Sequence, residues 1–244
     1  MIRAAAALLA LLCAAGASAA TCSEARHEGV RFTTCAVDLS TQTLRLFLYG
    51  VDGAPLGEFR AVDAALRDEG LRLGFAMNAG MYHADRAPVG HYVEDGTQVR
   101  GVIRGASPGN FGLVPNGVFC IRPGRADVIE TEAFLRRAPD CTYATQSGPM
   151  LVIDGALHPR FLPDGTSRFV RNGVGTSADG QTAYFVISRS SVNFHDFGTF
   201  FRDVLEVPNA LYFDGNVSRL HAPGIGRSDL GRMMGPIVGT VVPR

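Results

Sequence analysis

The 244-residue sequence predicts a single α+β domain with a mixed, largely antiparallel sheet and a few packed helices. Short apolar runs broken by Gly and Pro indicate strands joined by tight hairpins, which connect antiparallel neighbours. The few stretches with helical patterns do not alternate regularly with the strands, as a doubly wound fold requires. The chain also has no internal repeat, low-complexity tract or linker at which it would divide into two domains.

Composition and charge restrict the possible partners. Apolar residues make up 46% of the chain and charged residues 19%, as in a foldable globular protein. The formal net charge is +0, so the charge balance favours neither a nucleic acid nor an anionic membrane surface as a partner. All 23 basic residues are Arg. Any cationic side chain that binds an anion here is therefore a forked guanidinium.

The N-terminus has the pattern of a secretory signal peptide. Arg3 provides the positive start, Ala4–Ala15 the apolar core, and Ala17-Ser18-Ala19 a small-residue cleavage site. The apolar run is too short and too rich in alanine for a transmembrane anchor. The sequence therefore predicts a signal peptide over residues 1–20 and a mature periplasmic or secreted domain over residues 21–244. It leaves the oligomeric state open.

Cysteine usage agrees with export. Removing the signal peptide removes Cys13 and leaves an even set of four cysteines, as expected in an oxidising compartment. Four cysteines allow three pairings, and proximity in sequence favours Cys22–Cys35 with Cys120–Cys141. A zinc site is the rival interpretation, but the chain has no C-x-x-C motif and no nearby pair of histidines. We therefore expect two disulfides and no metal.

The first half of the mature chain contains alternating and hairpin patterns. Leu44, Leu46 and Leu48 alternate with other residues at the period of two that is typical of a strand. Further expected elements are a helix over Val62–Glu69 that ends at Gly70, a buried strand over Leu73–Met77, and a hairpin of Gly90–Val93 with Val99–Arg104 around Asp95-Gly96.

A strand broken by Gly-Pro marks the middle of the chain. Thr142–Gly155 begins as a strand, breaks at Gly148-Pro149 and resumes over Met150–Ile153. Proline cannot donate to a sheet ladder, so the chain must leave regular pairing there. Gln146 and Ser147 precede this break, where side chains can point out of the sheet into a cleft. The stretch is therefore a candidate part of a functional site.

The second half adds helices and strands around this stretch. We expect a helix over Glu130–Arg137, a loop over Phe161–Gly175, and strands over Ala183–Ile187, Ala210–Phe213 and Ile237–Val242. Asn193 is the expected cap of a last helix, Phe194–Leu205. The residues of that helix that fall on one apolar face are Phe194, Phe197, Phe201 and Val204.

Each polar residue near a strand end has a structural interpretation as well as a functional one. Asp214 follows a strand and precedes a glycine, which is also the pattern of an ordinary Asp-Gly turn. Asn78 and Asn116 precede small residues, as turn residues often do. Arg171 with Asn172 could hold an oxyanion or form a solvated pair in a loop.

Two further arrangements are weaker. Ser147 with His158 and Asp154 suggests a serine hydrolase, but the leading glycine of a nucleophile elbow is missing. His83 and Asp85 have the spacing of metal ligands, but no third ligand follows, which favours a surface loop. The chain also lacks a dinucleotide-binding or P-loop motif, so we expect no cofactor.

Several motifs taken together resemble the phosphodiester glycosidase family. They occur in order over residues 78–218, most of the predicted mature domain. The motifs are Asn78-Ala79-Gly80-Met81-Tyr82, Gly109-Asn110-Phe111, Pro115-Asn116-Gly117-Val118-Phe119, Ala144-Thr145-Gln146-Ser147-Gly148-Pro149, Arg171-Asn172-Gly173-Val174-Gly175 and Leu211-Tyr212-Phe213-Asp214-Gly215. The family includes the lysosomal uncovering enzyme and many exported bacterial proteins, some linked to exopolysaccharide. After Asp214 the chain has Gly215-Asn216-Val217-Ser218, where relatives of the uncovering enzyme often carry a glycine run before the serine.

The resemblance implies an exported hydrolase that cleaves a sugar C1–O–P linkage of an envelope or extracellular glycan. The phosphate monoester is a good leaving group, so such a site needs anion recognition more than the paired carboxylates of ordinary glycosidases. On this interpretation Asp214 is the nucleophile or general base, Arg171 holds the phosphate, and Gln146 completes the catalytic set. The expected substrate-binding residues are Asn78, Asn110, Asn116, Ser147, Gly148, Asn172 and Ser218. The alternative is a non-catalytic protein of the same fold that binds or assembles a glycan.

Overall fold

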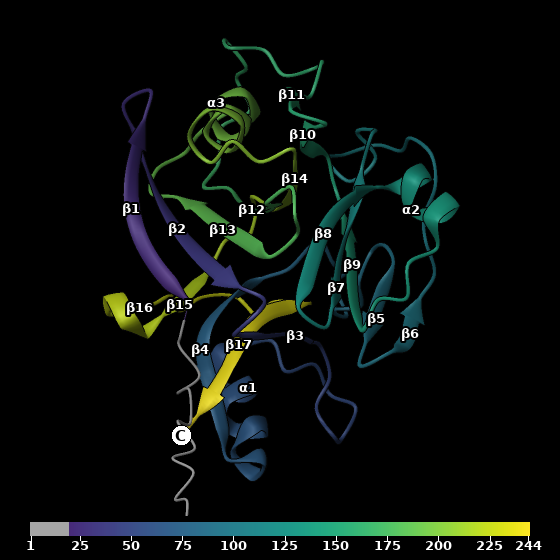
Figure 1. Ribbon diagram of the computed structural model, residues 1–244, viewed down its shortest axis with the longest axis vertical. Coiled ribbons are helices and arrows are strands. Elements are labelled where there is room, and N and C mark those ends of the chain that lie inside the picture. The colour runs from purple at the N-terminus through teal and green to yellow at the C-terminus, as the bar shows by residue number, and fades with distance from the viewer. Residues whose placement is uncertain (1–19) are drawn as a thin grey trace, which may run out of the picture.

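The computed structural model describes residues 20–244, in which three antiparallel sheets pack around a shared interior (Figure 1). Residues 1–19, which hold most of the expected signal peptide and Cys13, lie outside the described residues. All strand pairs in the described part of the chain are antiparallel. The expected α+β class is therefore confirmed, and the sheets are more uniform than the mixed sheet that the sequence suggests.

The first sheet has seven strands in the order β1-β2-β13-β12-β14-β10-β11. It brings the segment after residue 170 beside the segment that ends at Asp214, since β12 pairs with β14. Its strands are β1 (Thr21–His27), β2 (Val30–Asp38), β10 (Met150–Ile153), β11 (Ala156–Leu157), β12 (Asn172–Thr176), β13 (Thr182–Ser188) and β14 (Asn209–Asp214).

The second and third sheets have five strands each. The second, in the order β16-β15-β4-β17-β3, contains β3 (Thr43–Phe47), β4 (Leu71–Asn78), β15 (Leu220–Ala222), β16 (Arg227–Ser228) and β17 (Ile237–Pro243). The third, in the order β6-β5-β9-β7-β8, contains β5 (Tyr92–Glu94), β6 (Thr97–Arg100), β7 (Gly117–Arg122), β8 (Arg125–Glu130) and β9 (Tyr143–Ser147).

The expected loop over Phe161–Gly175 is wrong at its end, because residues 172–176 form β12 in the middle of the first sheet. The sequence does not predict this strand because two of its five residues are glycine, which is depleted in strands in general. Here glycine is required by close packing. A Cβ on Gly173 would lie 2.5 Å from the Leu211 carbonyl oxygen, and one on Gly175 would lie 2.8 Å from a methyl group of Val207.

Three short helices lie on the outside of the sheets (Figure 1). They are α1 (Phe59–Ala65), which continues as a 3₁₀ turn over Leu66–Glu69, α2 (Thr131–Arg137) and α3 (Phe194–Thr199). Gly70 ends the first in the left-handed conformation, as expected. Glu130 caps α2 by accepting hydrogen bonds from the backbone N–H groups of Glu132 and Ala133.

The buried face of the last helix differs from the one that the sequence predicts. Asn193 caps α3 as predicted, accepting from the Asp196 backbone N–H at 2.8 Å. Beyond α3, residues Phe200–Val204 form a π-helical turn, so the Leu205 N–H bonds to the Phe200 carbonyl oxygen five residues back. The wider turn rotates the face, so that Phe200 is buried and Val204 is 42% exposed.

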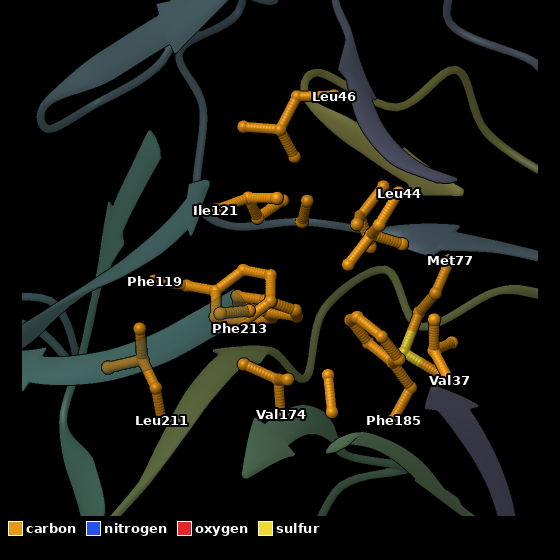
Figure 2. Packing of buried hydrophobic residues seen from close by; sticks show 14 of the residues in the cluster. Val37, Leu44, Leu46, Met77, Phe119, Ile121, Val174, Phe185, Leu211 and Phe213 are labelled. Atoms are coloured by element: carbon orange, nitrogen blue, oxygen red, sulfur yellow. The ribbon is translucent and has the colours of Figure 1, made fainter. Parts of the chain in front are cut away.

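The largest core cluster draws side chains from all three sheets, which supports one cooperative domain (Figure 2). Phe185 packs against Phe75 of the second sheet, with ring centroids 4.9 Å apart, and against Phe119 of the third at 5.8 Å. Phe119 also contacts Phe213, the residue before Asp214. The core thus fixes the end of β14 from which Asp214 extends.

Both expected disulfides are present, Cys22–Cys35 and Cys120–Cys141. The first joins residues that face each other across the β1–β2 pair. The second ties β7 to the segment before β9, and its sulfurs lie in a small cluster with Phe134 of α2. Each bond closes a short loop and stabilises the fold by about 2–4 kcal/mol.

No helix within residues 20–244 is long and apolar enough to span a membrane.

Candidate active site

Asp214 lies at the end of β14, on the wall of a pocket of about 590 Å³. The pocket lies between residues 81–89, the turn 214–217 and residues 232–233. Among the described residues that line this pocket, Asp214 is the only carboxylate, and it is half-buried. A partly enclosed carboxylate that lines a pocket large enough for a small molecule can take part in chemistry on a bound ligand.

The backbone holds this carboxylate in place. Oδ1 of Asp214 accepts hydrogen bonds from the N–H groups of Gly215 at 2.6 Å and Asn216 at 2.8 Å. None of the salt bridges in the described part of the chain includes Asp214. Burial raises the pKa of Asp214 above its usual value, and the backbone N–H donors oppose this shift only in part. The carboxylate is therefore more basic than an exposed aspartate.

Asn78 and Asn172 form a reciprocal amide pair behind Asp214. Each side-chain N–H₂ donates to the other's Oδ1, at 3.2 Å and 3.1 Å, which joins the end of β4 to the start of β12. Oδ1 of Asn172 also accepts from the Asp214 backbone N–H at 3.2 Å and from the Ser218 hydroxyl at 3.3 Å. Oδ1 of Asn78 accepts from the Arg219 backbone N–H. The structure thus brings four predicted site residues together: Asn78, Asn172, Asp214 and Ser218.

Arg171 lies beside this group, but its guanidinium is not available to a ligand. The residue is 0% exposed, and its N–H groups donate to the carbonyl oxygens of Val192 and Ser167 and to the Tyr212 hydroxyl. The guanidinium stacks on the Phe194 ring at 3.6 Å from the centroid. The sequence interpretation that Arg171 holds the phosphate directly does not agree with this geometry, because every direction around the cation is occupied by protein.

The hydroxyl of Tyr212 lies between Arg171 and the turn that carries Asp214. It accepts from Arg171 at 3.1 Å, and the Asn110 side chain is within hydrogen-bonding reach. Burial raises the pKa of Tyr212 well above its usual range, so the residue stays a neutral phenol. A Cβ on Gly215 would collide with this hydroxyl. The Arg171–Tyr212 pair therefore supports the turn that carries Asp214.

Gln146 and Asn116 belong to a separate network on the other side of β9. The Gln146 oxygen accepts from the His91 and Ile103 backbone N–H groups, and its N–H₂ donates to the Ile103 carbonyl and the Thr131 hydroxyl. That hydroxyl donates to Asn116 at 2.6 Å, and Asn116 donates to the Phe111 carbonyl oxygen.

In the described residues no hydrogen bond links this network directly to Asp214. Both amides are about 2% exposed, so they anchor the loops around residues 103 and 111 to the third sheet. The structure therefore separates Gln146 from the carboxylate with which the sequence interpretation groups it.

Ser147 and Gly148 connect the two groups through the backbone. The Ser147 hydroxyl donates to the Phe213 carbonyl oxygen at 3.2 Å, which ties β9 to the residue before Asp214. A Cβ on Gly148 would lie 2.7 Å from the Cβ of Asn116, so the chain passes too close for any other residue. His158 bonds to the Val114 carbonyl oxygen instead of Ser147. Within residues 20–244, Ser147 therefore has no histidine partner of the kind that a hydrolase triad needs.

Three further residues of the pocket lining are not among the site residues that the sequence predicts. Tyr82, Arg86 and Arg232 line it together with Asp214. Tyr82 is the last residue of the motif Asn78–Tyr82, but the two arginines lie in irregular segments that no sequence pattern marks. His83 and Asp85 are exposed, as expected.

A second hollow of about 450 Å³, between residues 39–44 and 121–124, contains none of the predicted site residues. No cluster of metal-ligating residues occurs within residues 20–244.

Comparison with known proteins identifies the fold and the family. The sequence model of the phosphodiester glycosidase family matches residues 72–222. An uncharacterised protein of Escherichia coli K12, YigE, is 32% identical over 188 residues, which cover 77% of this chain and 73% of the relative.

Solved structures agree with the sequence match. The zebrafish N-acetylglucosamine-1-phosphodiester alpha-N-acetylglucosaminidase catalytic domain, auto-inhibited by its pro-peptide, aligns with a TM-score of 0.60 at 15% identity, covering 90% of this chain and 81% of that one. A hypothetical protein from Synechocystis aligns with a TM-score of 0.55 at 14% identity, covering 91% and 62%. These two likenesses support the fold, and the sequence matches support the family. The chain therefore belongs to the phosphodiester glycosidase family.

Proposed function

We propose that the protein is an exported hydrolase that cleaves a glycosyl phosphodiester at the bond between the anomeric carbon and the phosphate oxygen. The family supports a glycosidase-type hydrolase. The two disulfides fit a periplasmic or secreted protein, which a signal peptide over residues 1–20 would export. The substrate on this proposal is an envelope or extracellular glycan.

The observation that carries the proposal is the single carboxylate of the pocket. Ordinary glycosidases use two carboxylic groups, because an alkoxide leaving group must be protonated. A phosphate monoester leaves without that help, so one carboxylate is sufficient. Asp214 acts as the nucleophile at the anomeric carbon or as the base that activates water. The electron pair of the broken C1–O bond goes to the phosphate oxygen, and water supplies the hydroxyl of the free sugar.

In this proposal the other predicted residues differ in how directly they act. Asn78, Asn172 and Ser218 fix the backbone on both sides of Asp214 and so orient its carboxylate. Arg171 is a positioning residue that acts through Tyr212. The remaining residues hold the loops that border the site, and these are Asn110, Asn116, Gln146, Ser147 and Gly148.

The test is turnover of a sugar 1-phosphodiester by the purified protein, measured as released free sugar. Asp214→Asn retains the size of the side chain and an oxygen for the Gly215 and Asn216 N–H groups, so the fold is preserved. We expect kcat to fall at least about a hundredfold, the contribution of a positioned base or nucleophile. The control is Asp154→Asn, because Asp154 is exposed in a turn. Binding of the substrate without turnover by the parent protein would instead support a glycan-binding protein.

A further inference from the structure

Two arginines face the same pocket as Asp214 but come from distant parts of the chain. Arg86 lies in the turn after Tyr82, and Arg232 lies just before Met233. The guanidinium of Arg86 lies 5.4 Å from the centre of the Tyr82 ring, and Arg232 is exposed. Neither takes part in any salt bridge found within residues 20–244. The pocket wall therefore contains two cations without a carboxylate partner.

The one nearby carboxylate does not neutralise them. Oδ1 of Asp214 accepts hydrogen bonds from the N–H groups of its own turn, and burial is the main cause that raises the pKa of this carboxyl. Two guanidinium groups against one carboxylate leave the lining with a net positive charge. A pocket of about 590 Å³ with this excess attracts a small anion.

We propose that Arg86 and Arg232 form the phosphate subsite of this pocket and bind the phosphodiester group of the substrate. The inference rests on the proposed function and assigns its anion recognition, which the burial of Arg171 leaves without a residue. Guanidinium groups match phosphate oxygens with paired, charge-assisted hydrogen bonds. Arg232 lies outside residues 72–222, the part of the chain that matches the family model.

The subsite also has a consequence for the reaction. Arg86, Arg232 and Asp214 line the same pocket, so a substrate whose phosphate binds the arginines can present its C1–O bond to the carboxylate. Negative charge grows on the phosphate as this bond breaks. Positioned cations stabilise that charge, so the arginines contribute to turnover as well as to binding.

The experiment measures binding of inorganic phosphate by calorimetry at constant ionic strength. We expect Arg86→Met and Arg232→Met each to weaken phosphate binding at least tenfold, and the double variant to abolish it. Asp214→Asn should bind phosphate more tightly than the parent, because it removes a negative charge from the pocket. The control is Arg60→Met, whose side chain is 85% exposed on α1 and lies outside the pocket lining. Arg232→Lys, which keeps the charge but loses the fork, should retain part of the affinity.

Unchanged phosphate affinity in the double variant, or no phosphate binding by the parent, would overturn the subsite. If the parent turns over a glycosyl phosphodiester while the double variant retains its KM and kcat, the proposed function stands and the subsite is wrong. If phosphate binds through the two arginines and no glycosyl phosphodiester is hydrolysed, the subsite stands and the hydrolase assignment is wrong.

Discussion

The role of Gln146 separates a structural account of this molecule from a catalytic one. Gln146→Met keeps the length of the side chain but removes its carboxamide. The change leaves the backbone N–H groups of His91 and Ile103 and the carbonyl oxygen of Ile103 without their side-chain partner. His91 is buried, whereas Ile103 is half-exposed and water can replace part of what it loses.

The expected cost follows from these three groups. A buried backbone group left without a partner costs about 1–3 kcal/mol, and solvent reduces that cost at Ile103. We therefore expect the free energy of unfolding to fall by about 2–5 kcal/mol. In a domain of this size each kcal/mol lowers Tm by about 2–4 °C, so Tm should fall by roughly 4–20 °C.

The assay is thermal and urea unfolding, with kcat measured at a temperature where the variant is fully folded. Gln98→Met is the matched control, since Gln98 is exposed on β6, and its stability should change by less than about 0.5 kcal/mol. The reasoning fails if Gln146→Met melts within a degree or two of the parent protein while kcat collapses. That outcome would make Gln146 a substrate ligand.

Three further predictions concern the cysteines, the Asp214 turn and pH. Alkylation without reduction should label none of the four described cysteines, and labelling before reduction would contradict the two disulfides. Gly215→Ala should destabilise the protein by about 1–3 kcal/mol and lower kcat, because the new methyl group collides with the Tyr212 hydroxyl. Gly224→Ala, which meets nothing within 4 Å, is the control for both readouts. Because the pKa of Asp214 is higher in the folded than in the unfolded protein, folding is more favourable when this carboxyl is protonated than when it is ionised. That contribution to stability is lost as pH rises through the folded-state pKa. At pH values above that pKa, Asp214→Asn should therefore have a higher Tm than the parent, and well below it the two Tm values should be equal. The kcat/KM of the parent should rise as pH increases through the same pKa. A lower Tm of the variant at neutral pH would contradict the raised pKa of Asp214.

Patterns of polarity and glycine predict much of the fold. The Gly70 cap, the Asn193 cap and the buried strand before Asn78 all result from local rules, and the structure confirms each of them. The central strand β12 was missed because Gly173 and Gly175 resemble loop residues. Glycine is required at both positions because Leu211, Phe201 and Val207 approach the backbone closely. Such a contact between distant segments leaves no signal in the local sequence.

The candidate site was predicted only in part for a similar reason. The motif residues Asn78, Asn172 and Asp214 do converge. A motif does not reveal which side of a strand a side chain occupies. The motifs therefore predict Arg171 and Gln146 as ligand-binding residues, whereas both side chains are buried among protein groups. Arg86 and Arg232 come from irregular segments and meet only in the folded pocket. Their positions depend on tertiary structure.

The central claim is that the protein breaks the bond between the anomeric carbon and the phosphate oxygen. Hydrolysis of a sugar 1-phosphodiester in ¹⁸O-labelled water tests it directly, because the label marks the atom that water attacks. Mass spectrometry should find ¹⁸O in the released sugar and an unlabelled phosphate monoester, and Asp214→Asn should release neither at a comparable rate. Label in the phosphate product would show attack at phosphorus and contradict a glycosidase mechanism.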